Sequence, residues 1–421
     1  MLALRGGDPV RSTPFPYWPV FGEKEETALL HVLRSGNWWY GDKVRSFEER
    51  YARFQDARYG VSCSNGTVAL ELALRALGIS AGDEVLVPAY TFIATATAVL
   101  TVNAKPVFVD VSEENYNIDL DHAETLVNEN TKAIIVVHFA GLPVDIDRVE
   151  TFARRRGVLV VEDAAHAWGS QWKGMGVGAL LGMGTFSFQM SKNITSGEGG
   201  IILTNHKDVA DLARSYTHCG RTAANVWYQH AHVGGNYRIT EFQAALLLEQ
   251  LARLPEQTRT RELNALYLNE RLSAIPGIRL PQHDDRVTRR SYHIYMFRYL
   301  RDEFAAGSRE IFLNALRAEG IPASQGYLTP VYGNNCFQDL RSVPGLERCS
   351  SERFCDRAAV DFSGVCCPVA EKLCREEAVW LPHALLLGDR KDMESVVAAI
   401  EKLYAHREEL EHMGHGKGKR K

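Results

Sequence analysis

Apolar and polar positions along the N-terminal part of the chain predict strands and helices in turn. Apolar runs that predict strands occupy residues 59–63, 84–87, 106–110, 132–137 and 158–161. The last of these runs is apolar throughout, as expected for a strand that is buried on both faces of a parallel sheet. Stretches with the helical spacing of apolar residues lie between the runs. This alternation predicts an α/β fold with helices on both faces of a mostly parallel sheet.

The pattern changes at Pro255. A helix is expected at 241–254, and beyond the proline we expect a long charged helix, a half-buried strand and two further helices, at 257–274, 292–299, 308–318 and 391–410. This order indicates a smaller α+β domain with an antiparallel sheet.

The length of the chain supports two domains, because 421 residues exceed what one hydrophobic core usually serves. We expect a large domain at 1–255 that includes an aromatic N-terminal arm. A small domain should follow at 256–412, and residues 413–421 should form a disordered basic tail.

Composition narrows the function classes. The chain is 45% hydrophobic and 24% charged, as in an ordinary globular protein. Its net charge of −4 argues against a nucleic-acid or membrane-surface protein. Residues 1–12 contain no apolar targeting segment, so a cytoplasmic location is expected. The eight cysteines contain no CxxC pair, which favours reduced thiols and no metal site.

One lysine stands between two predicted buried strands. Lys192 follows the apolar run 185–188 and precedes a glycine-rich segment and the run 201–204. Burial lowers the pKa of a lysine and makes its amine a nucleophile towards carbonyls. The alternative is a solvated charge on a loop, and Lys192 alone does not decide between the two.

Asp163 favours the reactive lysine over the solvated loop charge. It stands at the carboxyl end of the strand 158–161, where open α/β sheets bind their ligands. A lysine together with an aspartate for a pyridinium nitrogen is what a pyridoxal phosphate (PLP) site requires. The alternative role for Asp163 is to cap a helix that begins at Ala164.

Three further segments carry candidate ligands. Gly66 and Thr67 begin a predicted helix, whose backbone N–H groups attract anions. Phe92 follows a strand and could stack on a cofactor ring or belong to the core. Two aromatic groups could form a pocket wall or pack in the core, namely Trp38, Trp39 and Tyr40 on one loop and Tyr327 and Tyr332 on another.

With these segments in hand, the chain resembles the DegT/StrS family of PLP-dependent sugar and cyclitol aminotransferases. The resemblance covers about residues 16–410 and rests on five motifs in order, at 65–70, 88–92, 162–166, 186–200 and 235–238. It implies fold type I, with a large domain around a mostly parallel seven-stranded sheet and a smaller α+β C-terminal domain.

The resemblance also implies catalytic roles. Lys192 would carry the cofactor covalently and then move protons as acid and base. Asp163 would pair with the pyridine nitrogen, and His166 would lie near the 3-hydroxyl group of the cofactor.

Cofactor-binding roles follow in the same way. Gly66, Thr67 and Ser187 would hold the phosphate, and Phe92 would stack on the ring. Asn236 would reach the phosphate from the neighbouring subunit, which implies an obligate homodimer with shared active sites.

Within the family, the resemblance is closest to the branch that includes glutamine:scyllo-inosose aminotransferases and aminohydroxybenzoate synthases. It implies a keto-cyclitol such as scyllo-inosose as substrate, with L-glutamine as amino donor, in aminocyclitol (antibiotic-type) biosynthesis. The aromatic loops suit a polyhydroxylated ring and contain no lysine or arginine for a diphosphate. A nucleotide-linked 3- or 4-keto-sugar is the alternative, with basic contacts from segments such as 286–290. A further alternative is a non-catalytic PLP-binding regulator of the same fold. Another is a nucleotide-binding enzyme, although no G-x-G-x-x-G motif for a dinucleotide follows the first strand.

Overall fold

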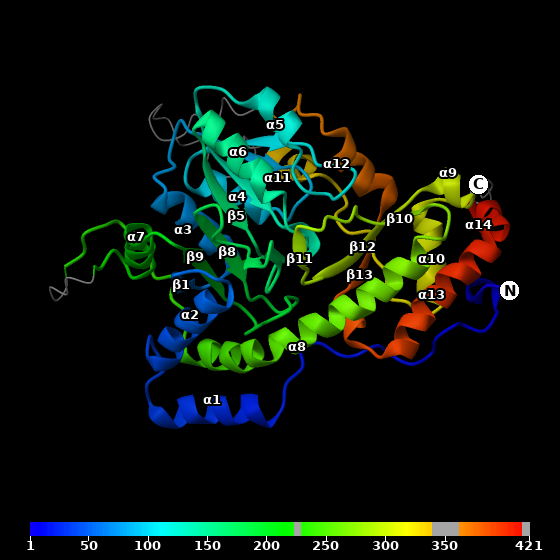
Figure 1. Cartoon of the computed structure of the whole chain (residues 1–421), viewed down its shortest axis with the longest axis horizontal. Coiled ribbons are helices and arrows are strands. Elements are labelled where there is room, and N and C mark those ends of the chain that lie inside the picture. Colours follow the sequence, from blue (N-terminus) through cyan, green and yellow to red (C-terminus); the bar gives the residue numbers. More distant parts are fainter. Residues whose placement is uncertain (223–228, 339–361, 415–421) are drawn as a thin grey trace.

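A computed structural model describes residues 1–222, 229–338 and 362–414 (Figure 1). Its main sheet has seven strands in the order β1 (Tyr59–Cys63), β9 (Gly200–Thr204), β8 (Met183–Ser187), β5 (Leu159–Asp163), β4 (Thr131–Val137), β2 (Glu84–Pro88) and β3 (Lys105–Val109). Neighbouring strands are parallel from β8 to β3, whereas β9 is antiparallel to both of its neighbours. The predicted mostly parallel sheet is therefore confirmed.

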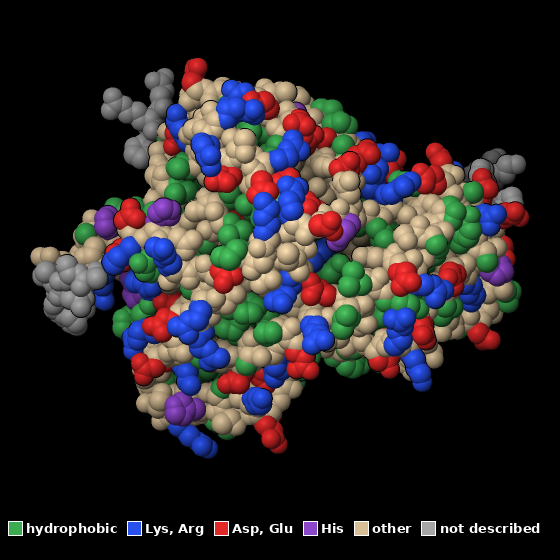
Figure 2. Space-filling model, viewed as in Figure 1, with side chains coloured by type: hydrophobic (Ala, Val, Ile, Leu, Met, Phe, Trp, Pro, Cys, Tyr) green, Lys and Arg blue, Asp and Glu red, His purple; other side chains and the backbone are tan. Residues whose placement is uncertain are grey.

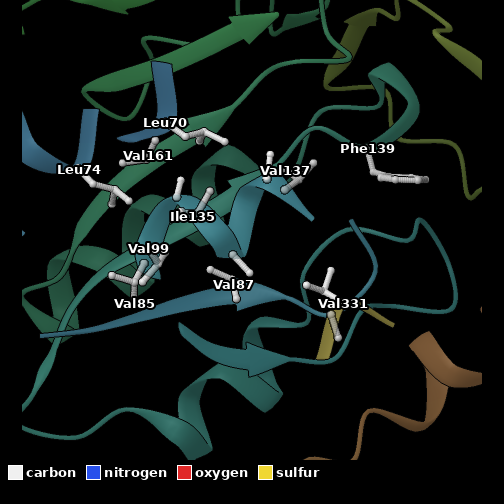
Figure 3. Packing of buried hydrophobic residues seen from close by; sticks show 14 of the residues in the cluster. Leu70, Leu74, Val85, Val87, Val99, Ile135, Val137, Phe139, Val161 and Val331 are labelled. Carbon is white, nitrogen blue, oxygen red and sulfur yellow. The ribbon is translucent and has the colours of Figure 1, made fainter. Parts of the chain in front are cut away.

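Both faces of this sheet are apolar and covered by helices. Side chains alternate along β2, so Val85 and Val87 belong to one core and Leu86 to the other. Figure 3 shows the first core, where strand valines lie against residues of two covering helices. That face is covered by α3 (Gly66–Ala76), α4 (Ala94–Thr101) and α7 (Lys207–Thr217). The opposite face is covered by α2 (Asp42–Phe54), α5 (Leu120–Leu126), α6 (Ile146–Arg156) and the first half of α8 (Glu241–Leu272).

A second, antiparallel sheet has its own core. It contains β10 (Ile278–Arg279), β12 (Ile294–Tyr299) and β13 (Ala378–Pro382), and it packs against α10 (Arg309–Ala318) and α13 (Arg390–Ala405). This arrangement confirms the smaller α+β unit. A third small sheet contains β6 (Gln171–Trp172), β7 (Met175–Gly176) and β11 (Val287–Arg289).

The remaining helices are short or peripheral. They are α1 (Glu23–Ser35), α9 (Arg301–Phe304), α11 (Asn335–Gln338), α12 (Pro368–Lys372), α14 (Arg407–Gly414) and the single turns Ala3–Arg5, Phe139–Gly141, Val331–Gly333, Leu373–Glu377 and Leu385–Leu387. No helix within the described ranges is long and apolar enough to cross a membrane. On the face shown in Figure 2, acidic and basic side chains are interspersed.

The prediction of two helices separated at Pro255 is wrong. Helix α8 continues through the proline and links the two sheets (Figure 1). A proline inside a helix costs about 3 kcal/mol. Packing on both sides offsets this cost, because Leu254 is buried in the core of the main sheet and Leu268 in the core of the second sheet. The domain boundary at 255, which stays a prediction, falls inside this helix.

The N-terminal segment lies beside the C-terminal part of the chain (Figure 1). Buried Glu319 accepts hydrogen bonds from the N–H groups of Ala3 and Val10 at 2.8 and 3.0 Å, and from Lys402 Nζ at 2.8 Å. The arm that was expected with the large domain therefore begins against the smaller α+β unit. Residues 415–421 of the predicted tail lie outside the described residues.

Candidate active site

A cavity of about 740 Å³ opens at the carboxyl ends of the central parallel strands. It collects residues from segments that are far apart in the sequence. The predicted site residues on its walls are Gly66, Thr67, Phe92, Asp163, His166, Ser187, Lys192 and Tyr327.

Lys192 enters the cavity from the connection between β8 and β9. These two strands pair antiparallel up to Ser187 and Gly200, which fixes both ends of the connection. Burial lowers the pKa of Lys192 to about 8, and the negative charge of Asp163 opposes this shift. The amine is therefore neutral in a larger fraction of molecules than an ordinary lysine at neutral pH.

Asp163 ends β5 and is 5% exposed. Its Oδ2 accepts a hydrogen bond from Thr95 Oγ1 at 2.9 Å, and its Oδ1 accepts one from the N–H of Ala165 at 3.2 Å. Burial raises the pKa of this carboxyl, whereas the two hydrogen bonds and Lys192 lower it. Residues 164–170 form turns, so the alternative of a helix cap at Asp163 is not realised.

His166 has a defined neutral form. The N–H of Ala140 donates to its Nδ1 at 3.4 Å, which leaves the ring proton on Nε2. Burial, and secondarily the positive charge of Lys192, holds the pKa of His166 well below its usual range. The ring therefore presents a neutral hydrogen-bond donor.

An anion cradle forms where α3 begins. Asn65 caps this helix by accepting a hydrogen bond from the N–H of Val68 at 2.9 Å. Asn65 and the first residues of the helix, Gly66 and Thr67, line the cavity. A Cβ on Gly66 would lie 2.7 Å from Ser187 Cβ, so only glycine allows this close approach. Backbone N–H groups of Gly66 and Thr67, together with the hydroxyl groups of Thr67 and Ser187, suit a phosphate.

Phe92 is 56% exposed although it is large and apolar, and it forms part of the cavity wall. The core alternative for Phe92 is therefore excluded. An aromatic face open to a cavity suits stacking on a flat ring.

The structure does not bring Tyr40 and Tyr332 to this cavity. Tyr332 is 6% exposed, and its hydroxyl donates to Glu371 Oε1 at 2.7 Å. Tyr40 donates to Glu48 Oε2 at 2.9 Å within a cluster that also contains Arg214. Both hydroxyl groups are thus bonded within the fold, and neither residue lines this chain's cavity, where both were expected.

Trp38, Trp39 and Asn236 also lie outside the cavity. Each tryptophan is 52% exposed, and the ring of Trp39 lies 6.0 Å from that of His218. Asn236, which is exposed, forms a β-bridge with the same His218. These three predicted residues therefore lie outside the described cavity wall, and Trp39 and Asn236 lie beside the same histidine.

Sequence reasoning missed several residues of the wall. Thr91 lines the cavity, and Thr95, four residues later and outside the described wall, bonds to it at 3.0 Å and to Asp163 at 2.9 Å. The spacing of four residues could have indicated this pair. His293, directly before β12, and Trp380, in the middle of β13, also line the cavity, and no local pattern predicted them. Trp380 lies edge to face with Tyr327 at 4.9 Å.

The expected cofactor fits this arrangement. PLP needs an amine, a carboxylate for its ring nitrogen, donors for its phosphate and an aromatic face, and the cavity supplies all four. Among the residues that the structure describes, no group of three or more His, Cys, Asp or Glu side chains is placed to hold a metal ion.

Comparison with known proteins agrees with this geometry. Residues 19–379 match the DegT/DnrJ/EryC1/StrS aminotransferase family. An L-glutamine:2-deoxy-scyllo-inosose aminotransferase of Streptomyces fradiae is 36% identical over 429 residues, covering 97% of this chain and 99% of its own. A 3-amino-5-hydroxybenzoate synthase of Amycolatopsis mediterranei is 35% identical over 400 residues, covering 93% of this chain and 97% of its own. The crystal structure of a 3-amino-5-hydroxybenzoic acid synthase has a TM-score of 0.82 at 33% identity, covering 94% of this chain and 100% of its own.

Proposed function

Because the chain belongs to the DegT/DnrJ/EryC1/StrS aminotransferase family, and so is a PLP-dependent transaminase, we propose that it moves an amino group from L-glutamine to a keto-cyclitol such as scyllo-inosose. The observation that carries this proposal is the cavity that joins Lys192 and Asp163 with walls suited to an uncharged polyol. The pathway would be aminocyclitol biosynthesis of the antibiotic type.

Lys192 and Asp163 would perform the chemistry. PLP, when bound, supplies an electron sink for negative charge at the carbon that bears the amine. Lys192 would carry the cofactor covalently and then, as a free amine, move the proton between the two carbons concerned. The carboxylate of Asp163 would keep the ring nitrogen protonated. Both side chains share one buried cavity, which argues against a non-catalytic regulator.

Five further predicted residues of this chain would contact the cofactor, and one of them, Phe92, would stack on its ring. Gly66, Thr67 and Ser187 would hold the phosphate at the start of α3. His166 would donate its Nε2 hydrogen to the 3-hydroxyl oxygen, since its Nδ1 is already an acceptor.

An uncharged ring suits the part of the cavity that faces Tyr327. Within the described ranges the lining contains one lysine, Lys192, and no arginine. Its histidines, His166 and His293, have pKa values held well below the usual range by burial, so they are neutral. The faces of the aromatic rings in the wall offer apolar contact to a polyhydroxylated ring, and the polar groups at their edges offer hydrogen bonds. Neither attracts a diphosphate strongly.

The alternative acceptor, a nucleotide-linked 3- or 4-keto-sugar, has less support. Arg286, which was considered for its diphosphate, forms ion pairs with Asp145, Asp147 and Asp284. Arg290 lies over the ring of Tyr292 at 4.4 Å. Both side chains are thus engaged outside the cavity.

The second half-reaction tests the acceptor. Enzyme in the pyridoxamine form is mixed with keto-inositol or with a nucleotide-linked keto-sugar, and return of the visible absorbance is followed. We expect return with keto-inositol. Return with the nucleotide-linked ketone only would contradict the cyclitol proposal and leave the transaminase assignment intact.

A homodimer with shared sites would explain where Asn236 and Trp39 lie. Both belong to segments predicted to contact cofactor or substrate, yet both lie on one surface with His218 and outside this chain's cavity. Such residues would complete a site across an interface, so we propose that Asn236 reaches the phosphate bound by a second copy. We propose that Trp38, which is adjacent to Trp39 in the sequence, lies at the same interface.

Hybrid dimers test this assembly. Mixing the Lys192→Ala and Asn236→Asp chains should restore roughly a quarter of the wild-type activity, because half of the dimers are hybrids and each hybrid has one intact site. The matched control mixes Lys192→Ala with Asp163→Ala, whose defects lie in the cavity of one chain, and should restore nothing. A fully active monomer in dilute solution would refute the shared site.

A further inference from the structure

The two neighbours of Lys192 are each held by a buried histidine. His383 Nε2 lies 3.0 Å from the carbonyl oxygen of Ser191, and His293 Nδ1 lies 3.0 Å from Asn193 Oδ1. The register of β12 and β13, which pairs Ile294 with Pro382, places these histidines side by side. Their rings stack with centroids 5.5 Å apart at an interplanar angle of 29°. The second sheet thus supports the lysine loop from its buried side.

Arg261 of α8 fixes the form of His383. Its Nη2 lies 3.2 Å from His383 Nδ1. A guanidinium can only donate, so Nδ1 accepts, and the ring proton lies on Nε2. That N–H then donates to the carbonyl of Ser191, the peptide group directly before Lys192. Burial, reinforced by the charge of Arg261, holds the pKa of His383 well below its usual range, so the ring is neutral.

The burial of Arg261 is unusual. The residue is 0% exposed, and within the described ranges its Nε and Nη1 form no hydrogen bond and its guanidinium pairs with no carboxylate. Burial lowers the pKa of Arg261 to about 9, so it stays protonated at neutral pH. A buried charge without a counter-ion opposes folding. Stability therefore does not account for this residue, whereas its contact with His383 does.

Trp18 of the N-terminal arm makes the third contact beneath the loop. Its Nε1 donates to the carbonyl oxygen of Met190 at 3.1 Å. Its ring lies edge to face with that of His383 at 4.7 Å and 5.5 Å from the guanidinium carbon of Arg261. Consecutive carbonyl groups of the lysine loop are thus each held by a ring N–H from a distant part of the chain.

We propose that Trp18, Arg261 and His383 form a positioning unit that sets the place of the Lys192 amine without touching substrate. None of the three belongs to the described cavity wall. Their hydrogen bonds end on the backbone at 190 and 191, so losing one lets the lysine loop shift. A displacement of the reacting amine by about 1 Å lowers the rate by as much as about 10²-fold.

Two substitutions of His383 test this unit. His383→Phe keeps a ring but removes the donor to Ser191, and His383→Gln keeps an N–H donor. For the amino donor that the wild-type enzyme uses fastest, His383→Phe should lower kcat by about 10- to 100-fold with KM unchanged. It should also lower the fraction of cofactor that borohydride fixes to Lys192. His383→Gln should recover most of both losses.

A tryptophan pair provides an independent test if His383→Phe does not fold. Trp18→Phe removes the N–H that donates to Met190, whereas Trp172→Phe removes one that donates to Asp147 Oδ1 at 3.4 Å, outside the cavity. We expect a several-fold loss of kcat and weaker fixation to Lys192 in the first variant only.

Several results would overturn the proposal. They are a normal kcat in His383→Phe, equal losses in His383→Phe and His383→Gln, and equal behaviour of the two tryptophan variants. A rise in KM in place of the fall in kcat would also overturn it, since it would place His383 in substrate binding.

Discussion

Lys192→Ala is expected to lose transamination by about 10³-fold or more, because no other described lysine lines the cavity to carry the cofactor and move the proton. The variant should still bind PLP, but without a covalent bond. In the wild-type enzyme, borohydride should fix the cofactor to the peptide that contains Lys192, which mass spectrometry identifies.

We also predict how the reactivity of Lys192 depends on pH. Burial lowers the pKa of Lys192 to about 8, so in the apoenzyme an acylating reagent should label it with a midpoint near that pH. Below this midpoint the amine is protonated and unreactive, and above it the amine reacts. An ordinary exposed lysine should have its midpoint about two units higher.

Lys207→Ala is the control for the lysine substitution. Lys207 is an exposed lysine on α7 that pairs with Asp211, so its loss should leave turnover and cofactor binding unchanged. Reduction that labels a lysine other than Lys192 would contradict the assignment.

Asp163→Asn should lower kcat by about 10²-fold or more, the second-largest effect expected. Asparagine keeps the shape and can still accept from Thr95, but it lacks the charge that would hold the ring nitrogen protonated. The loss should appear in kcat with KM little changed, because the interaction matters most when negative charge develops in the reaction. Steady-state kinetics with a saturating amino donor measures it.

Asp110→Asn is the matched control. Asp110 follows β3, the neighbour of β2 at the sheet edge, is 6% exposed, and accepts from the N–H groups of Val369 and Ala370 at 2.9 Å each. It lies outside the described cavity wall, so its substitution should lower thermal stability and leave kcat almost unchanged. Near-normal turnover in Asp163→Asn would mean that another group holds the ring nitrogen.

The main sheet and the centre of the site could be predicted because local patterns carry them. The apolar run before Asp163 predicts a buried strand, and ligands gather at the carboxyl ends of such strands. The two apolar runs around Lys192 likewise place the lysine on a short connection, and both side chains do line one cavity.

The antiparallel type of the second sheet was predicted, but the contacts that its residues and the neighbouring loops make could not be predicted in this way. Tyr327 and Tyr332 stand on one aromatic loop, yet the first lines the cavity and the second is buried against Glu371. Sequence spacing does not separate them, because which face of a loop meets the cavity depends on what packs against it.

By itself, therefore, the sequence determined the parallel sheet, the strand ends and the pairing of a lysine with an aspartate, because side-chain periodicity is a local property. Only the tertiary structure decided that α8 continues through Pro255 and that His383 reaches the carbonyl of Ser191. These features depend on pairings between residues more than a hundred positions apart or on packing at both ends of one helix. The free energy of such contacts exceeds local preference, so local preference does not reveal them.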